Sequence, residues 1–405
     1  MQTPSLKLNL GRRGGVDVVG LDIQPGHVAA VQARVNGSIV VKHAAGAPLP
    51  ADTVREGEVL DEGVLSETLR EVFKDGGLSR RVRLGVANQR TVLRTLELPP
   101  ITDRKELDAA VRFQAQDQVP MPLSNAVLDF HPLGIFDTPE GPRQRVVLVA
   151  AQRDMVQRLL AAVRDAGLRP EGVDLSAFAL IRSLYRPDPE HAGRVLYLNV
   201  DGLTNMAIAE GTICRFTRVV GGGIEAMASE LAERRSIPLV DARVLIAAVD
   251  LTVSPTPEPA PQVTVEAESE SVAVDDAEAP TVVEEGIPST ITSDPAHPSA
   301  VPSEGAPATP DADVRTVLEN GIREIAGEVR NSLDFHRSQE GGGEVSLVVL
   351  SGSALDLPGF AEALQEQLGV QVERESVRLD EQDLGGVSAH RLAIAAGLAV
   401  EEVSQ

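Results

Sequence analysis

The sequence has no tryptophan, only ten aromatic residues among 405, and a single cysteine, Cys214. One cysteine excludes an internal disulfide and a thiolate zinc site, and this is typical of a reducing cytosol. Few aromatic rings and a net charge of −23 disfavour nucleic-acid binding, which needs a basic surface and often stacking rings. We therefore expect a protein that binds no nucleic acid.

Long apolar runs are missing as well. No segment approaches the roughly 18–20 apolar residues of a membrane span, and the N-terminal segment lacks the apolar core of a signal peptide. The expectation is a cytoplasmic protein with no segment inserted directly into a membrane.

Common catalytic motifs are absent too. The sequence contains no G-x-x-x-x-G-K-[ST], G-x-S-x-G or H-E-x-x-H, and its seven histidines are scattered without metal-ligand spacing. Cys214 lies on a predicted strand and is interpreted as a core residue rather than a nucleophile. P-loop, hydrolase and metalloprotease chemistry are set aside.

The negative charge is concentrated in one stretch. Residues 251–313 contain 13 Asp+Glu, 11 Pro, no Lys or Arg and no aromatic residue, so they carry −13 of the −23. Such a segment buries too little apolar surface to offset chain entropy, and we interpret it as a disordered linker. It is either an insertion without a partner or a docking tail, and the sequence leaves both open.

Outside this linker, two regions share one order of predicted elements. The first has strands at Val16–Ile23, from His27 to Val35 and from Ser38, with an Asn36-Gly37 hairpin, then a helix at 61–74 and a strand at 81–87. The second has strands at 194–200, 205–210 and 212–220, helices at 224–234 and 314–333, a strand at 345–350 and a helix at 358–368. This predicts a duplicated α/β fold with a cleft between its halves.

A third unit interrupts the first half. It has a strand-like TVLRTLELP, a helix from Asp103 to Gln118, a strand at 146–150 and a helix at 154–165, which predicts a small α+β subdomain. The predicted domains are a tail at 1–15, the first half at 16–88 with a return helix at 176–193, the inserted subdomain at 89–175, the second half at 194–250 and 314–405, and the linker at 251–313.

Three loops after buried strands have the composition of a phosphate or nucleoside site. Asp22 ends a strand beside a tight turn at Gly26, and a carboxylate there can hold a metal-bound water. The stretch from Asn199 to Thr204 occupies the equivalent place in the second half, and Ser351-Gly352-Ser353 follows a third strand. Each could also be an ordinary turn. Gly221–Gly223 before a helix could expose amides to an anion or be a flexible connection.

Three strand-end loops in duplicated halves are the layout of the actin-like ATPase superfamily, which this chain resembles. Within it, the sequence is similar to the type IV pilus assembly protein PilM family, which is related to FtsA. The most specific match is AVRFQAQDQVPMPLSNAVLDF from Ala110 to Phe130; EVRNSLDFH and LSGSALDLPGFAEALQEQLG also look like family segments. The implied fold is a duplicated actin-like α/β fold around a nucleotide cleft, with an inserted α+β subdomain.

The resemblance implies ATP and Mg²⁺ as ligands and the cytoplasmic N-terminal tail of the inner-membrane protein PilN as a partner. The tail would dock between the inserted subdomain and the first half, bordered by the 82–98 strands and the 110–118 helix. Other platform proteins or an assembly motor are further implied partners, and homo-oligomers are left open. The implied nucleotide-binding residues are Gly20, Asp22, Gln24, Gly26, Asn199, Asp201, Gly202, Thr204, Gly221, Gly222, Ser351, Gly352 and Ser353, with Asp22 and Asp201 as metal ligands.

Two loops depart from the family pattern. Gln24-Pro25 follow Asp22-Ile23 where small polar residues are usual, and proline removes a backbone amide. In the second loop, either Asn199 or Asp201 stands at the carboxylate position. Both changes weaken Mg·ATP handling, so we expect an assembly scaffold or conformational switch without robust catalysis. The alternatives are an active ATPase or sugar-kinase-like enzyme, motivated by Asp22 and Asp201, and an FtsA-like filament protein. The acidic C-terminal end, which lacks a basic amphipathic helix, disfavours direct lipid binding.

Overall fold

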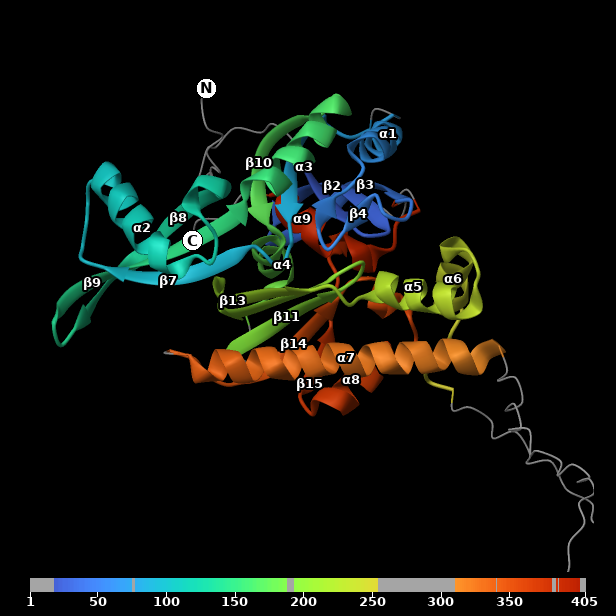
Figure 1. Ribbon diagram of the computed structural model, residues 1–405. Coiled ribbons are helices and arrows are strands. Elements are labelled where there is room, and N and C mark those ends of the chain that lie inside the picture. The colour runs from blue at the N-terminus through green and yellow to red at the C-terminus, as the bar shows by residue number, and fades with distance from the viewer. Residues whose placement is uncertain are drawn as a thin grey trace, which may run out of the picture. The chain divides into compact units, whose positions relative to one another are not determined.

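The computed structural model describes residues 18–74, 77–187, 193–253, 310–339, 341–380, 384 and 386–400. These residues form two α/β halves and a smaller sheet-and-helix subdomain (Figure 1). The predicted tail at 1–15 lies outside the described residues, as does the predicted linker apart from residues 251–253 and 310–313.

The first half is built on a six-stranded sheet with the order β10-β6-β1-β2-β3-β16. Its strands are β1 (Val19–Gln24), β2 (His27–Asn36), β3 (Ser38–Pro48), β6 (Arg81–Val86), β10 (Arg169–Leu175) and β16 (Arg378–Leu379). β1, β2 and β3 pair antiparallel, β6 is parallel to β1, and β10 is parallel to β6. The predicted hairpin at Asn36-Gly37 is confirmed, and Gly37 has a φ of 68°, which favours glycine. A small two-stranded sheet, β4 (Val54–Arg55) and β5 (Glu58–Val59), follows β3.

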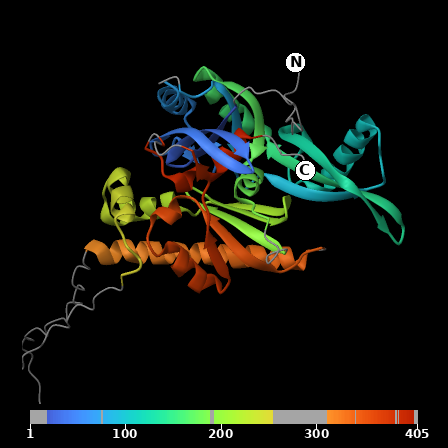
Figure 2. The same cartoon turned by 180° about the vertical axis from the view of Figure 1, so that it is seen from behind.

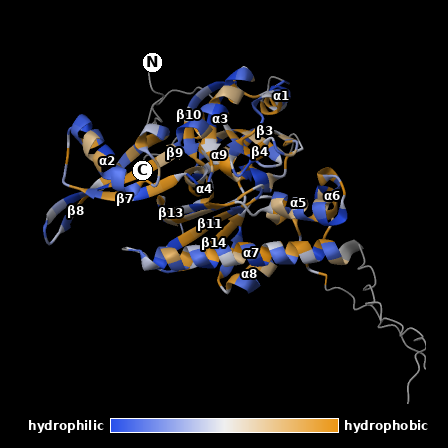
Figure 3. Cartoon of the chain, viewed as in Figure 1, coloured by the Kyte–Doolittle hydropathy of each residue, from blue (hydrophilic) through white to orange (hydrophobic). Residues whose placement is uncertain are grey.

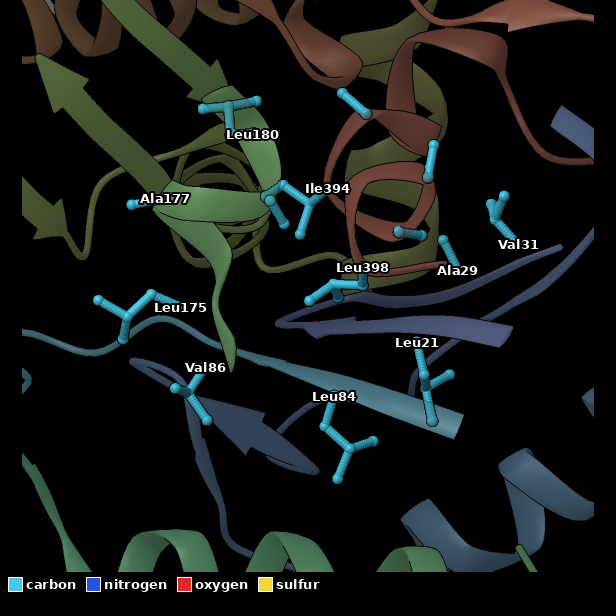
Figure 4. Close-up of a cluster of buried hydrophobic side chains, with 14 of the residues drawn as sticks. Leu21, Ala29, Val31, Leu84, Val86, Leu175, Ala177, Leu180, Ile394 and Leu398 are labelled. Carbon is cyan, nitrogen blue, oxygen red and sulfur yellow. The ribbon is translucent and has the colours of Figure 1, made fainter. Parts of the chain in front are cut away.

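Helices cover both faces of this sheet. α1 (Glu62–Val72) packs on α3 (Arg153–Asp165), and α4 (Ser176–Leu184) packs on α9 (Ala393–Ala399). The α-carbon of Gly20 lies against α9, because a methyl group built there would be 1.8 Å from the carbonyl oxygen of Ala395. Figure 4 shows Ile394 and Leu398 of α9 above the strands that carry Leu21 and Leu84. α9 is apolar all round and therefore requires burial on every side.

The second half repeats the first. Its five-stranded sheet has the order β13-β12-β11-β14-β15, with β11 (Arg194–Val200), β12 (Thr204–Glu210), β13 (Ile213–Val220), β14 (Val345–Ser351) and β15 (Gln371–Arg374). The first three strands form an antiparallel meander, and β14 and β15 continue parallel to β11. The equivalent order in the first half is β3-β2-β1-β6-β10, so the predicted duplication is confirmed.

The helices of the second half are α5 (Ile224–Arg235), α6 (Leu239–Ala247), α7 (Pro310–Ser338) and α8 (Phe360–Leu368). α7 runs along the second sheet, with its apolar residues in a stripe broken by polar ones (Figures 2 and 3). It begins four residues before the predicted Val314, inside the predicted linker. α8 begins at Phe360 rather than Pro358, because Gly359 has a φ of 84° and forms its N-cap.

Cys214 lies on β13 and is buried, as predicted for a core residue. Burial raises the pKa of its thiol to about 12, so the thiol stays protonated and unreactive at neutral pH.

The inserted subdomain has its own sheet and core. Its elements are β7 (Val92–Leu98), α2 (Arg104–Gln118), a 3₁₀ turn (Leu123–Asn125), β8 (Ala126–Thr138) and β9 (Gly141–Gln152), with the strand order β7-β9-β8. Leu107 and Val111 of α2 pack on Val146 and Leu148 of β9. α3 and β10 were predicted in this unit, but β10 pairs with β6 and α3 packs into the core of the first half. We therefore propose that the subdomain spans about residues 89–152.

The C-terminal segment also crosses between the halves. Residues after β15 were predicted in the second half, yet β16 pairs with β3, and a 3₁₀ turn (Ala389–Leu392) leads into α9 in the core of the first half. The segment therefore passes the junction of the halves, where the three predicted loops meet.

Candidate functional site

The first predicted loop, called loop 1 here, spans residues 22–26 at the end of β1. Asp22 and Gln24 are buried, although both are polar. The Gln24 Nε2 donates to Asp22 Oδ2 over 2.8 Å. The chain then turns through Pro25 and Gly26, whose φ of 86° favours glycine.

Loop 2 spans residues 199–204 in the second half and faces loop 1. The backbone N–H of Leu203 donates to Gln24 Oε1 over 3.3 Å, so one side chain joins the two loops. The backbones also touch: a methyl group built on Gly202 would lie 2.2 Å from the carbonyl oxygen of Pro25. The structure therefore brings Asp22, Gln24 and Gly202 together, as the sequence predicted for the two loops.

Loop 3, residues 351–353, packs against loop 2. Ser351 Oγ donates to Asn199 Oδ1 over 3.0 Å, and Ser353 Oγ donates to Asp201 Oδ1 over 2.7 Å. Between these serines, Gly352 has a φ of 96°, and its α-carbon lies against the backbone of Val200. Glycine at 352 therefore permits backbone packing inside the second half.

The remaining predicted glycines take different roles. Gly20 lies against α9, away from the loops, and Gly221 lies near Gln89 and Glu56. Gly222 has open space around its α-carbon, and its carbonyl oxygen accepts a hydrogen bond from Thr204 Oγ1 over 2.5 Å.

Two buried groups at the junction have strongly shifted pKa values. Burial raises the pKa of Asp22 to about 7; the Gln24 hydrogen bond lowers it and the nearby Asp201 raises it. Burial lowers the pKa of His27 to about 4, against the opposing effect of Asp201. His27 Nε2 lies 3.6 Å from Asp201 Oδ2, too long for a hydrogen bond, and we treat this histidine as neutral at pH 7.

A second set of contacts joins the halves beside the loops, and no sequence pattern indicates it. Arg243 of α6 forms an ion pair with Glu225 of α5, with 2.9 Å between Nε and Oε2. The same guanidinium donates to the backbone oxygen of Leu49 in the first half over 3.3 Å. The Glu225 carboxylate lies so close to Gly26 that a methyl group built there would clash with it.

The loops border a cavity of about 370 Å³, called the cleft cavity here. Members of all three loops line it, together with charged residues from α5, α6 and the C-terminal segment: Gly26, Asp201, Ser353, Glu225, Arg243 and Arg391. Its volume lies within the range of small-molecule sites. Arg391, which the sequence did not single out, lies 3.8 Å from Asp201 Oδ1.

The fit of a Mg²⁺–triphosphate to these residues is poor at the phosphate end. Asp22 and Asp201 already accept hydrogen bonds from protein donors, and the backbones of loops 1 and 2 touch between them. Across the described ranges, no three His, Cys, Asp or Glu side chains are grouped so as to hold a metal ion. The nucleoside end has more room, because the cleft cavity opens beside the loops.

A second cavity, called the hinge cavity here, lies where the inserted subdomain leaves the first half. It measures about 420 Å³. Its lining combines the 86–91 link with β12, β13 and α7, and its polar members are Asn88, Gln89, Thr91, Asn205, Thr217, Arg218 and Glu328. Asn205 Nδ2 and Thr91 Oγ1 are buried without a hydrogen-bond partner. The sequence could not have found this site, because its lining comes from distant segments.

None of the described helices has the length and hydrophobicity needed to cross a membrane.

Comparison with known proteins finds a matching family model and a matching fold. Residues 20–198 match the family model described as type IV pilus assembly protein PilM. A solved structure, the PilM-PilN type IV pilus biogenesis complex, matches with a TM-score of 0.68 and 21% identity, covering 95% of this chain and 98% of the other.

Two further structures match with lower scores. The ethanolamine utilization protein EutJ from Carboxydothermus hydrogenoformans has a TM-score of 0.47 and 14% identity, covering 96% of this chain and 90% of the other. MreB5 of Spiroplasma citri bound to AMPPNP has a TM-score of 0.45 and 10% identity, covering 94% of each chain. The family model over residues 20–198 and the matching fold confirm the resemblance seen in the sequence, and the chain has the duplicated actin-like α/β fold.

Proposed function

We propose that this protein is a PilM-like scaffold of type IV pilus assembly that captures the cytoplasmic N-terminal tail of a PilN-type inner-membrane partner. The fold match to a PilM-PilN complex supports this assignment. Through such a tail, the protein would be held at the inner membrane and could meet other platform proteins or the assembly motor. The observation that carries the docking proposal is the hinge cavity, which has unpaired hydrogen-bonding groups. Residues of the predicted 82–98 border line it, but none of the predicted 110–118 helix does.

Two edge strands lie near the hinge cavity, and one of them, β13, lines it. β7 is an edge strand of the three-stranded sheet, and β13 is an edge strand of the five-stranded sheet. β7 and β13 lie close together, and residues 217–220 of β13 line the cavity. An edge strand presents free N–H and C=O groups, which an extended peptide can satisfy by main-chain pairing.

Side chains in the hinge cavity add specificity. Asn205 Nδ2 and Thr91 Oγ1 are polar atoms without a partner, and leaving such atoms buried is unfavourable. A peptide carbonyl could accept from either group. Beside them, Arg218 and Glu328 form an ion pair of 2.7 Å between Nη2 and Oε2, which offers one charge of each sign to a polar peptide side chain.

We further propose that a nucleotide enters the cleft cavity as a conformational ligand. Ser353, Arg243 and Arg391 line that cavity and could hold its nucleoside and phosphate groups by hydrogen bonds and charge. Asp22 and Asp201 would act as the predicted metal ligands only once their hydrogen bonds with Gln24 and Ser353 are broken. A bound nucleotide would supply negative charge and a bridge between the halves; we assign no catalytic step to this site.

The docking proposal is tested by titrating a synthetic PilN-tail peptide into the full chain. Asn205→Leu keeps the side-chain volume but removes the amide donor, and we expect it to weaken binding at least tenfold. Asn320→Leu changes the same residue type on the exposed face of α7 and serves as the matched control. Circular dichroism checks that both variants fold. Failure of the wild type to bind, or equal binding by both variants, would contradict the proposed site.

A further inference from the structure

We propose that the Gln24 side chain is an internal lock, which holds loops 1 and 2 together without nucleotide and must be displaced before a phosphate chain can lie between them. The inference rests on the proposed function in one respect, because it concerns regulation of the same cleft. It depends on residues of this chain, and especially on the Gln24-Pro25 pair that departs from the family pattern.

Gln24 is suited to this role by its position and its chemistry. It is buried at the carboxyl end of β1, and its carboxamide uses both ends: Nε2 donates to Asp22 in the first half and Oε1 accepts from the Leu203 N–H in the second. A carboxamide has both a donor and an acceptor, so it can satisfy a carboxyl group and an amide at once. A phosphate oxygen could accept from the Leu203 amide but could not donate to Asp22.

The loop backbones leave no room beside this side chain. The carbonyl oxygen of Pro25 occupies the space next to the α-carbon of Gly202, and the α-carbon of Gly223 lies against the carbonyl oxygens of Asp201 and Gly202. Pro25 also has no N–H to offer an anion. The closed arrangement is therefore packed at the backbone level, and admitting a phosphate chain requires the halves to separate.

Arg243 makes a second closure on the cavity side. It is held by Glu225 and donates across to the carbonyl oxygen of Leu49, while Glu225 itself lies against Gly26. The Gln24 and Arg243 contacts both join the two halves through side chains of the protein, at the place where a ligand could bridge them. A nucleotide must therefore compete with contacts that are already made. Its apparent affinity is the affinity of the open protein multiplied by the fraction of molecules that are open.

The test measures hydrogen exchange and nucleotide binding on the full chain. In Gln24→Ala, we expect the Leu203 amide to exchange at least tenfold faster than in the wild type. The Leu49 amide, which donates to the Gly26 oxygen over 2.9 Å, should be unchanged and reports that the region remains folded. Gln157→Ala, on the exposed face of α3, is the matched control and should leave both amides unchanged.

Titration with ATP, with and without Mg²⁺, gives the second readout. Tighter binding by Gln24→Ala than by wild type supports the lock, and weaker binding by Gln24→Ala overturns it, as does an unchanged Leu203 exchange rate. If Leu203 exchanges faster in Gln24→Ala but neither protein binds ATP, the lock is supported. The same result overturns the separate proposal that the cleft takes a nucleotide.

Discussion

The cleft cavity and the hinge cavity are similar in volume but differ in how their polar groups are satisfied. At the cleft, Asp22, Gln24 and Asp201 hydrogen-bond with other protein groups, and the loops touch. At the hinge, Asn205 Nδ2 and Thr91 Oγ1 lack partners. Buried polar groups are normally paired, yet both cavities have unpaired ones, because His27 Nε2 and Asn199 Nδ2 also lack partners at the cleft. The cleft differs from the hinge in that hydrogen bonds and backbone contacts already join its loops.

The largest expected effect comes from wedging the cleft open. Gly202→Ala places a methyl group against the Pro25 oxygen and should lower the free energy of unfolding by about 3 kcal/mol. Gly222→Ala adds the same methyl group where no atom lies within 4 Å and should change it by less than about 0.5 kcal/mol. Urea denaturation of both variants measures the difference. Equal effects would show that the loops do not touch.

The charge state of Asp22 gives the next effect. Its folded pKa of about 7 exceeds the unfolded value of 3.8, so the folded state binds the proton more tightly and Asp22 lowers stability as pH rises between these values. His27 acts in the opposite sense, because its folded pKa of about 4 lies below the unfolded value of 6.5. Its contribution to stability therefore increases as pH rises between these values and is lost as pH falls.

Asp22→Asn removes the pH dependence that Asp22 causes and leaves the one that His27 causes. Relative to wild type, it should gain about 2 kcal/mol of stability between pH 5 and pH 8. Denaturation curves at the two pH values measure this gain. A mutant-to-wild-type difference that is the same at both pH values would contradict the raised pKa of Asp22.

Removing one polar group at each cavity should change the free energy of unfolding in opposite directions. Ser353→Ala deletes the hydrogen bond to the buried Asp201 carboxylate and should cost about 1.5 kcal/mol of stability. Asn205→Leu removes a donor that has no partner and should raise stability by about 0.5 kcal/mol without peptide. Thermal unfolding of the two variants shows whether each change lowers or raises stability. A loss of stability in Asn205→Leu as large as in Ser353→Ala would remove the distinction between the cavities.

Much of the fold could be predicted from local sequence. The strand β11 has the predicted bounds, both meanders were predicted, and the hairpin at Asn36-Gly37 followed from turn chemistry. α9 was missed because its small apolar residues show no polar face, so periodicity gave no signal. The assignment of α3 and β10 to the inserted subdomain was wrong because sequence order alone does not show which sheet a strand joins.

The candidate site was predictable only as a set of loops. Asp22, Asp201 and Ser353 meet as expected from strand ends, but the Gln24 bridge to Leu203 depends on two residues 179 positions apart. Gln24 was noted as a departure that weakens nucleotide handling, without its bridging role. The hinge cavity combines the 86–91 link, Asn205, Arg218 and Glu328, and no local motif connects them.

Hydrogen exchange of the wild-type protein with each ligand tests the central claim most directly. The PilN-tail peptide should slow exchange at residues 217–220 of β13, which line the hinge cavity. Saturating Mg·ATP should change the exchange rate of the Leu203 amide, because the phosphate chain must displace Gln24, which holds this amide. An unchanged Leu203 exchange rate in the nucleotide-bound protein, together with no protection of β13 by the peptide, would contradict the account.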